Sequence, residues 1–190
     1  MSAASRPTDT IRALDPERER ARLTAVMTGY LDALAARDPS GLRLAPDFRY
    51  TEDSQHIAPG SGIWRTIRAV RRDGHYFVDT DAGQVEYWGI VDEMGKPAMV
   101  AIRIKVDGRM ISEVETIVTR DGAYFDPATA IEDPGTSFHA RLEPEARGSR
   151  EALIAAADRY FDAIENTDGS LAPVRDDCRR LVNGVVDSVD

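Results

Sequence analysis

The sequence predicts an α+β fold, in which a curved antiparallel sheet packs on N-terminal helices and a helical extension follows. Two helical segments and one strand-rich segment carry this prediction. Apolar residues recur at helical spacing over residues 15–37 and again over 149–165. Between them, residues 75–119 alternate or run apolar between turn residues. A helix followed by a meander of strands is typical of an α+β domain rather than of repeated β-α-β units.

The first helix has clear start and stop signals. Asp15 suits the N-cap, Pro16 suits the first helical position, and acidic residues follow in the first turn. The apolar stripe consists of Leu23, Val26, Met27, Tyr30, Leu31 and Leu34. Asp38-Pro39-Ser40-Gly41 ends the helix, and a short helix or turn is expected over 40–44.

Strands are expected where apolar residues alternate between turn signals. Their ranges are 48–52, 75–80, 84–91, 97–106 and 109–119. The turns between the last four are Asp81-Ala82-Gly83, Met94-Gly95-Lys96 and Asp107-Gly108. Residues 53–73 contain Gly and Pro, and no helix or strand is assigned to them. Residues 123–148 contain three prolines and few periodic apolar residues, so they are interpreted as a wrapping loop.

Three parts follow along the chain. Residues 1–14 are expected to be disordered, 15–125 to form the α+β domain, and 126–190 to form a wrapping loop and a C-terminal helical extension. The extension echoes the first helix with an offset of about 130 residues. The echo pairs Tyr30-Leu31-Asp32-Ala33 and Asp38-Pro39-Ser40-Gly41-Leu42 with Tyr160-Phe161-Asp162-Ala163 and Asp168-Gly169-Ser170-Leu171. This partial repeat would be either a remnant cap or the start of a second half.

Composition excludes several classes of protein. A net charge of −9 argues against nucleic-acid binding. No apolar run is long enough to span a membrane, and the polar N-terminus lacks a secretory signal, so a cytoplasmic location is expected. Cys178 is the single cysteine, which excludes an internal disulfide. The three histidines show no metal-ligand spacing and no cofactor motif occurs, so neither a metal nor a cofactor is expected.

The last hairpin holds the main candidates for chemistry. Asp107-Gly108 favours a two-residue turn. That register pairs Ile102 with Glu113 and Val100 with Glu115. Because directly paired residues share a face of the sheet, both glutamates would lie on an otherwise aliphatic face.

Three interpretations of these acids stay open. In a cavity, desolvation and mutual repulsion would raise the pKa values of Glu113 and Glu115 toward that of a general base. A one-residue slip would instead place both acids beside Arg103 and Lys105 in a salt-bridged cluster. The face could also simply meet solvent. In a catalytic site, Arg103 or Lys105 would stabilise a developing oxyanion.

Other residues could complete a site. Glu52 and Tyr50 could form an acid–base pair across the pocket. His75 could relay a proton, although a structural role is commoner for a histidine at the start of a strand. Aromatic side chains that could line the pocket and stack on a ligand ring are Trp64, Tyr76, Tyr87 and Trp88.

Several short motifs together resemble the SnoaL-like branch of the nuclear-transport-factor-2-like superfamily. They are Tyr30-Leu31-Asp32-Ala33-Leu34, Tyr50-Thr51-Glu52-Asp53, Gly60-Ser61-Gly62-Ile63-Trp64, Arg103-Ile104-Lys105-Val106 and Glu113-Val114-Glu115-Thr116-Ile117-Val118. The resemblance covers about residues 20–125. It implies a cone-shaped sheet with one deep pocket, and cofactor-independent proton transfer in the enzymes of the superfamily. Other members are non-catalytic binding or dimerisation modules.

Two function classes follow. The first is a cofactor-free lyase, with an isomerase or cyclase as alternatives. It would act on a small hydroxylated aromatic molecule of lignin-derived or polyketide-like type, for example by elimination or deformylation. The second is a non-catalytic ligand-binding or dimerisation domain. An isolated carboxylate in a cavity would favour the enzyme, and fully paired acids the binding domain. A homodimer is also expected, because Val114, Thr116 and Val118 would form an open apolar face.

Overall fold

The computed structural model describes residues 15–122, 124–128 and 142–187. The helices are α1 (Pro16–Ala36), α2 (Ile63–Thr66) and α4 (Arg150–Glu165), with short 3-10 turns η1 (Pro39–Gly41), η2 (Pro144–Ala146) and η3 (Gly169–Leu171). The strands are β1 (Leu44–Glu52), β2 (Gln55–His56), β3 (Ile67–Val70), β4 (His75–Asp79), β5 (Gln84–Glu93), β6 (Lys96–Asp107), β7 (Met110–Thr119), β8 (Leu181–Val182) and β9 (Val185–Val186). The expected disorder of residues 1–14 lies outside the described residues, as does part of the expected wrapping loop.

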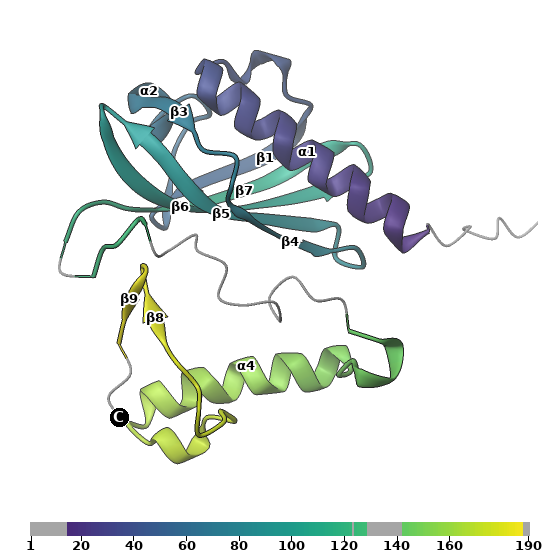
Figure 1. Ribbon diagram of the computed structural model, residues 1–190. Coiled ribbons are helices and arrows are strands. Elements are labelled where there is room, and N and C mark those ends of the chain that lie inside the picture. The colour runs from purple at the N-terminus through teal and green to yellow at the C-terminus, as the bar shows by residue number, and fades with distance from the viewer. Residues whose placement is uncertain (1–14, 123, 129–141, 188–190) are drawn as a thin grey trace, which may run out of the picture.

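One curved sheet forms the body of the protein. Its strand order is β2-β1-β7-β6-β5-β3, and β4 also pairs with β5. All pairs are antiparallel except β1 with β7, which is parallel. The predicted antiparallel sheet therefore has one parallel pair near its edge. Helix α1 lies across one face of the sheet, whereas α4 and the β8–β9 hairpin lie on the side of the other face (Figure 1).

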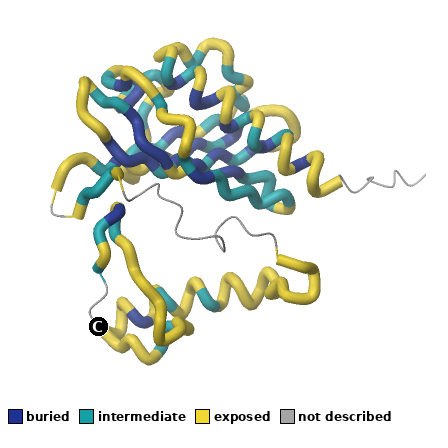
Figure 2. Tube along the Cα trace, viewed as in Figure 1, coloured by how far each residue is buried: buried dark blue, intermediate teal, exposed yellow. Residues whose placement is uncertain are grey.

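The core lies between α1 and the sheet face that it covers, here called the inner face. The predicted α1 stripe is buried at Leu23, Met27, Tyr30, Leu31 and Leu34. Figure 2 shows burial concentrated in the sheet and in the side of α1 that faces it. The Asp15 carboxylate caps the helix by accepting a hydrogen bond from Glu17 N–H, as the sequence predicts.

The segment over residues 53–73 is more ordered than a loop. It contains β2, the single-turn helix α2 and β3. These elements are too short to show a periodic pattern. They form because Ile63, Trp64 and Ile67 reach the core, where each is nearly fully buried.

The β6–β7 hairpin differs in register from the prediction. Asp107 pairs with Met110, so the turn lies one residue later than expected, and a bulge follows at Lys105 and Val106. Lys105 consequently pairs with Glu113, and Arg103 pairs with Glu115. The slipped alternative is therefore the correct one. The bulge changes which residues of the two strands share a face, and it places Val114 and Val118 with Ile102 and Ile104 on the inner face, where burial stabilises them.

This register also removes the surface on which a homodimer was expected. Val114, Thr116 and Val118 lie on the inner face and are buried. They cannot contact a second copy of the chain. The homodimer stays a prediction, and any dimer contact must use another surface.

The echo between the two long helices extends to their backbone geometry. Arg37 directly follows α1, and Thr167 lies two residues after α4; their φ angles are 58° and 54°. Each is followed by an aspartate whose carboxylate accepts from the N–H two residues on, Ser40 or Ser170. Burial differs between the copies. The α4 counterparts of the α1 core residues are largely exposed, as Phe161 is at 66%.

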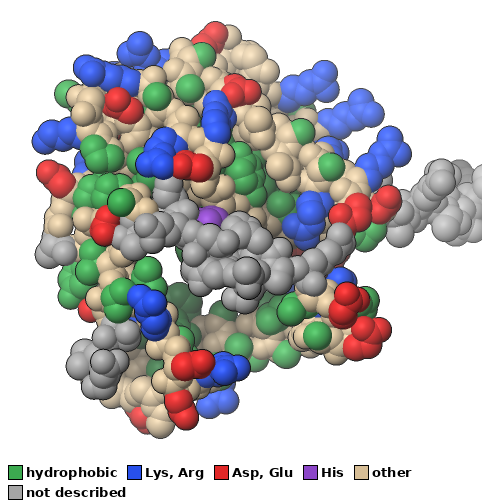
Figure 3. All heavy atoms as spheres, in the orientation of Figure 1, with side chains coloured by type: hydrophobic (Ala, Val, Ile, Leu, Met, Phe, Trp, Pro, Cys, Tyr) green, Lys and Arg blue, Asp and Glu red, His purple; other side chains and the backbone are tan. Residues whose placement is uncertain are grey.

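No helix in the described ranges is both long and apolar enough to cross a membrane. Acidic and basic side chains are interspersed on the face of the molecule drawn in Figure 3. That face shows no continuous basic patch.

Candidate functional site

A pocket lies between the outer face of the sheet and the C-terminal extension. Its volume is about 470 Å³. The floor comes from Trp88 and Ile90 of β5, from Met99 and Ala101 of β6, and from Ile117 and Thr119 of β7. The roof comes from Tyr160 of α4 and from the β8–β9 hairpin with Arg180 before it. In Figure 3, hydrophobic side chains gather along the opening between the two parts.

Strand alternation explains the floor. Successive side chains of a strand point to opposite faces, so Tyr87 and Val91 enter the core while Trp88 and Ile90 turn to the outer face. The Trp88 side chain is 46% exposed, and its ring lies 4.9 Å from that of Phe77. The floor therefore offers an accessible aromatic surface.

Two contacts hold the extension across this face. Arg150 at the start of α4 donates hydrogen bonds to both carboxylate oxygens of Asp79, one at 3.0 Å. At the other end, Asp126 N–H donates to the carbonyl oxygen of Asn183 at 2.9 Å. Asn183 and Gly184 form the β8–β9 turn with positive φ, as a tight hairpin requires. The pocket lies between these anchors.

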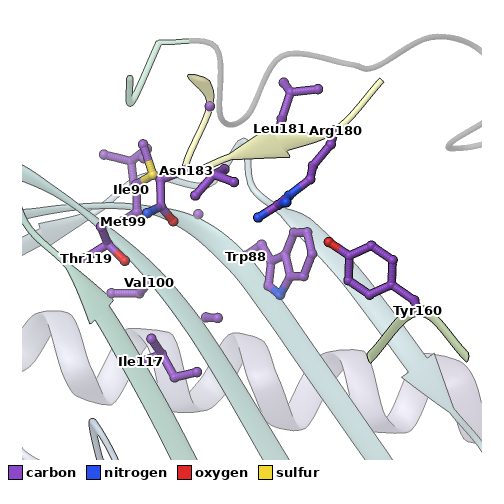
Figure 4. Close-up of a pocket in the computed structure, with 14 residues that line it drawn as sticks. Trp88, Ile90, Met99, Val100, Ile117, Thr119, Tyr160, Arg180, Leu181 and Asn183 are labelled. Carbon is purple, nitrogen blue, oxygen red and sulfur yellow. The ribbon is translucent and has the colours of Figure 1, made fainter. Parts of the chain in front are cut away.

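The described lining of the pocket is mostly apolar, with a few polar groups. Its polar groups include Arg180, Asn183, Thr119 and the Tyr160 hydroxyl (Figure 4). The described lining residues include no carboxylate, histidine or cysteine. These walls can bind and orient a ligand, but they offer no ordinary general base.

Sequence patterns do not single out Tyr160, Arg180 or Asn183 as site residues. They place Tyr160 in the apolar stripe of the second long helix. Asn-Gly at 183–184 is a strong hairpin signal that could have located the roof. Nothing in the sequence pattern shows that this hairpin faces β5.

The predicted acid pair lies outside this pocket, in an ion-pair cluster on the same face of the sheet. Arg103 donates to Glu115 at 2.9 Å and to Glu113 at 3.2 Å. Glu113 also accepts from Arg49, and the Lys105 ammonium lies 4.0 Å away. The cluster is the salt-bridged alternative that the slipped register implied.

The pairing changes the expected titration of Glu113. Burial raises the pKa of Glu113, but hydrogen bonds from Arg103 and Arg49 outweigh this effect and leave the pKa below its ordinary value. The expected rise in pKa is therefore wrong for Glu113. Glu115 is exposed and ion-paired rather than deeply buried.

Glu52 and Tyr50 lie on the inner face of the sheet, opposite the acid pair. The Tyr50 hydroxyl donates to Glu52 Oε2 at 3.0 Å, and Ile63 N–H donates to the same oxygen at 2.9 Å. Gly62 permits this close approach: its φ is 63°, and a Cβ there would lie 2.2 Å from Oε2. Within the described residues, no Lys, Arg or His side chain forms an ion pair with Glu52.

Buried aromatic and hydroxyl groups surround this pair. Tyr30 packs edge-on against Trp64, with ring centroids 5.3 Å apart. Burial raises the pKa values of both Tyr30 and Tyr50. The buried Thr116 hydroxyl lies beside both phenols. The inner face thus holds a polar cluster within an apolar core.

The other predicted residues are dispersed. Trp88 lines the pocket, whereas Trp64 and Tyr87 are core residues. Tyr76 packs on Tyr87 at 5.2 Å. His75 is buried at the start of β4 and does not line the pocket. Within the described ranges, no three His, Cys, Asp or Glu side chains are grouped closely enough to hold a metal ion.

Residues 16–118 and 146–187 match a family described as "Domain of unknown function (DUF8021)". The chain belongs to this family. The matched residues include α1, nearly all of the large sheet, and the extension that roofs the pocket. No curated protein sequence is significantly similar to the chain.

Similar solved structures include three bacterial proteins. A putative polyketide cyclase from Xanthomonas campestris pv. campestris is 17% identical, with a TM-score of 0.43, and the alignment covers 52% of this chain and 91% of that one. A putative ketosteroid isomerase from Kribbella flavida is 17% identical, with a TM-score of 0.42, and the alignment covers 65% of this chain and 91% of that one. AclR, a putative hydroxylase from Streptomyces galilaeus, is 11% identical, with a TM-score of 0.43, and the alignment covers 73% of this chain and 95% of that one.

Proposed function

We propose that the chain binds a small, flat, largely apolar organic molecule in the pocket between the sheet and the extension. The observation that carries the proposal is the pocket itself, with Trp88 exposed on its floor. A volume of about 470 Å³ is within the range of small-molecule sites. Support also comes from the acid pair, because paired carboxylates are the arrangement expected of a binding domain.

Tryptophan fluorescence tests this proposal, because the chain has two tryptophans and only one of them lines the pocket. We expect 2-naphthol, a flat hydroxylated aromatic probe, to quench Trp88 in a Trp64→Phe variant. Ile117→Arg places a charge on the apolar floor and should weaken binding at least about tenfold, since burying an unpaired charge is costly.

Glu115→Gln is the matched control, because Glu115 is near Ile117 in β7 but does not line the pocket. This variant should bind 2-naphthol as the parent does. Isothermal titration calorimetry measures the affinities without relying on a tryptophan. Equal affinity in Ile117→Arg and the parent would contradict the proposed site.

A second candidate function is acid–base catalysis at the inner face, favoured by the Glu52 carboxylate, which accepts two hydrogen bonds but forms no ion pair with a Lys, Arg or His side chain of the described residues. In this second proposal the chain is a cofactor-free lyase or isomerase of SnoaL-like type, and its catalytic groups are those of the inner face. Glu52 would accept a proton from the substrate, and Tyr50 would donate one to the leaving hydroxyl group. Arg103 and Lys105 would take no part, because they lie on the other face.

Ultraviolet screening of hydroxylated aromatic molecules tests this second candidate. For any molecule turned over, Glu52→Gln should lower turnover at least about a hundredfold, the range typical of a lost general base. Glu115→Gln should leave turnover unchanged and is the control. Full activity in Glu52→Gln would exclude the inner-face site. Circular dichroism of both variants checks that folding is intact.

A further inference from the structure

The pocket roof carries an arginine on the side opposite the apolar floor. Arg180 precedes β8, and its side chain extends toward Trp88 and the Tyr160 hydroxyl (Figure 4). The chain has 33 acidic residues, yet none is among the described residues that line this pocket. Arg180 is therefore the one charged side chain among the described lining residues, in a protein whose net charge is −9.

The Arg180 guanidinium is not fully engaged within the described residues. Its ion-pair partner there, Asp187, lies 3.6 Å away, which is beyond hydrogen-bond distance. Asp187 does not line the pocket. A guanidinium offers five N–H donors in a planar fork that matches a carboxylate with two parallel hydrogen bonds. An anionic group in the pocket would meet unused donors.

We infer that the ligand is a flat organic acid whose carboxylate binds Arg180 while its apolar ring lies on Trp88. The Tyr160 hydroxyl provides a second donor near the guanidinium. Ile90, Met99 and Ile117 surround the ring. This inference rests on the proposed binding function and specifies the class of ligand.

Two probes of nearly the same shape, of which only one is charged, show how much the charge of the ligand contributes to binding. 2-Naphthoic acid and 2-naphthamide share a ring system and differ in the anionic group. At neutral pH, we expect the full chain to bind the acid at least about tenfold more tightly than the amide, because a charge-assisted bidentate pair is stronger than a neutral hydrogen bond. Calorimetry gives both affinities, and added salt should reduce the preference.

Arg180→Met should remove the preference for the acid while leaving the amide affinity nearly unchanged. Arg179→Met is the control: Arg179 is adjacent and exposed, but it does not line the pocket. That variant should keep the preference.

Two results would overturn the inference. Equal binding of acid and amide by the parent, or an acid preference that survives in Arg180→Met, would refute the carboxylate site while leaving the proposed binding function in place. If neither probe nor 2-naphthol bound, the proposed function would fall together with the inference.

Discussion

Replacing Gly89 by alanine is expected to lower the free energy of unfolding by about 3 kcal/mol, since overpacking a filled core forces side chains and backbone apart. A Cβ at Gly89 would lie 2.1 Å from the Tyr87 hydroxyl oxygen and 2.3 Å from the adjoining ring carbon. Tyr87 cannot easily move away, because it is fully buried and its hydroxyl donates to the Arg71 carbonyl oxygen at 2.6 Å. This loss is large, because the whole free energy of unfolding of a typical domain is only about 5–15 kcal/mol.

Urea denaturation followed by circular dichroism measures this loss. Gly29→Ala is the control, because a Cβ at Gly29 meets no atom within 4 Å. In the interior of α1 that change should stabilise the chain by about 0.5–1 kcal/mol. Combining Gly89→Ala with Tyr87→Val should cost less than the sum of the single changes. If the losses in unfolding free energy of the two single variants added up in the double variant, the clash with Tyr87 would not be the cause of the destabilisation by Gly89→Ala.

Alkaline pH is expected to unfold the domain as buried tyrosines ionise. Burial raises the pKa of Tyr87 to about 12, and it also raises those of Tyr30 and Tyr50. In the unfolded chain a tyrosine has a pKa of about 10. Above that pH the unfolded state loses protons that the native state keeps. The stabilisation is therefore complete below about pH 10 and is lost as pH rises through the native pKa values.

Absorbance at 295 nm and circular dichroism, recorded together from neutral pH to pH 12.5, test this expectation. Part of the tyrosinate signal should appear only as the secondary structure is lost. Between about pH 10.5 and 11.5, the unfolding free energy of Tyr87→Phe should fall less steeply with pH than that of the parent, by up to about 1.4 kcal/mol per pH unit. Complete tyrosine ionisation without loss of structure would contradict the assignment of these phenols to the core.

Local patterns in the sequence were enough to predict the main elements. Helix α1 begins after its Asp15 cap, and α4 begins after the Ser149 cap. The four strands from β4 to β7 lie within a few residues of the predicted ranges. The repeat was also visible, and η1 and η3 reproduce its geometry. Each of these features depends on residues only a few positions apart, and such features can be read along a chain.

The arrangement of the site residues could be predicted less well than the helices and strands, because it depends on contacts between segments that are distant in the sequence. The Asp107-Gly108 signal located the hairpin but placed its turn one residue too early, and it gave no sign of the bulge. The missed bulge is what put Glu113 and Glu115 on the wrong face in the prediction. Tyr50 and Glu52 lie two residues apart in β1, so they share a face of the sheet and form a hydrogen bond, while their action as an acid–base pair stays a prediction.

The sequence by itself determined the α+β class, the order of the two long helices and the four strands from β4 to β7, the apolar stripe of α1 and the alternation that gives the sheet two different faces. Those properties follow from backbone geometry and local burial patterns. Only the tertiary structure decided which face α1 covers, which cations neutralise the acid pair, and that Arg180 lies across from Trp88. Residues 88 and 180 are far apart in the chain, and packing alone brings them to one pocket.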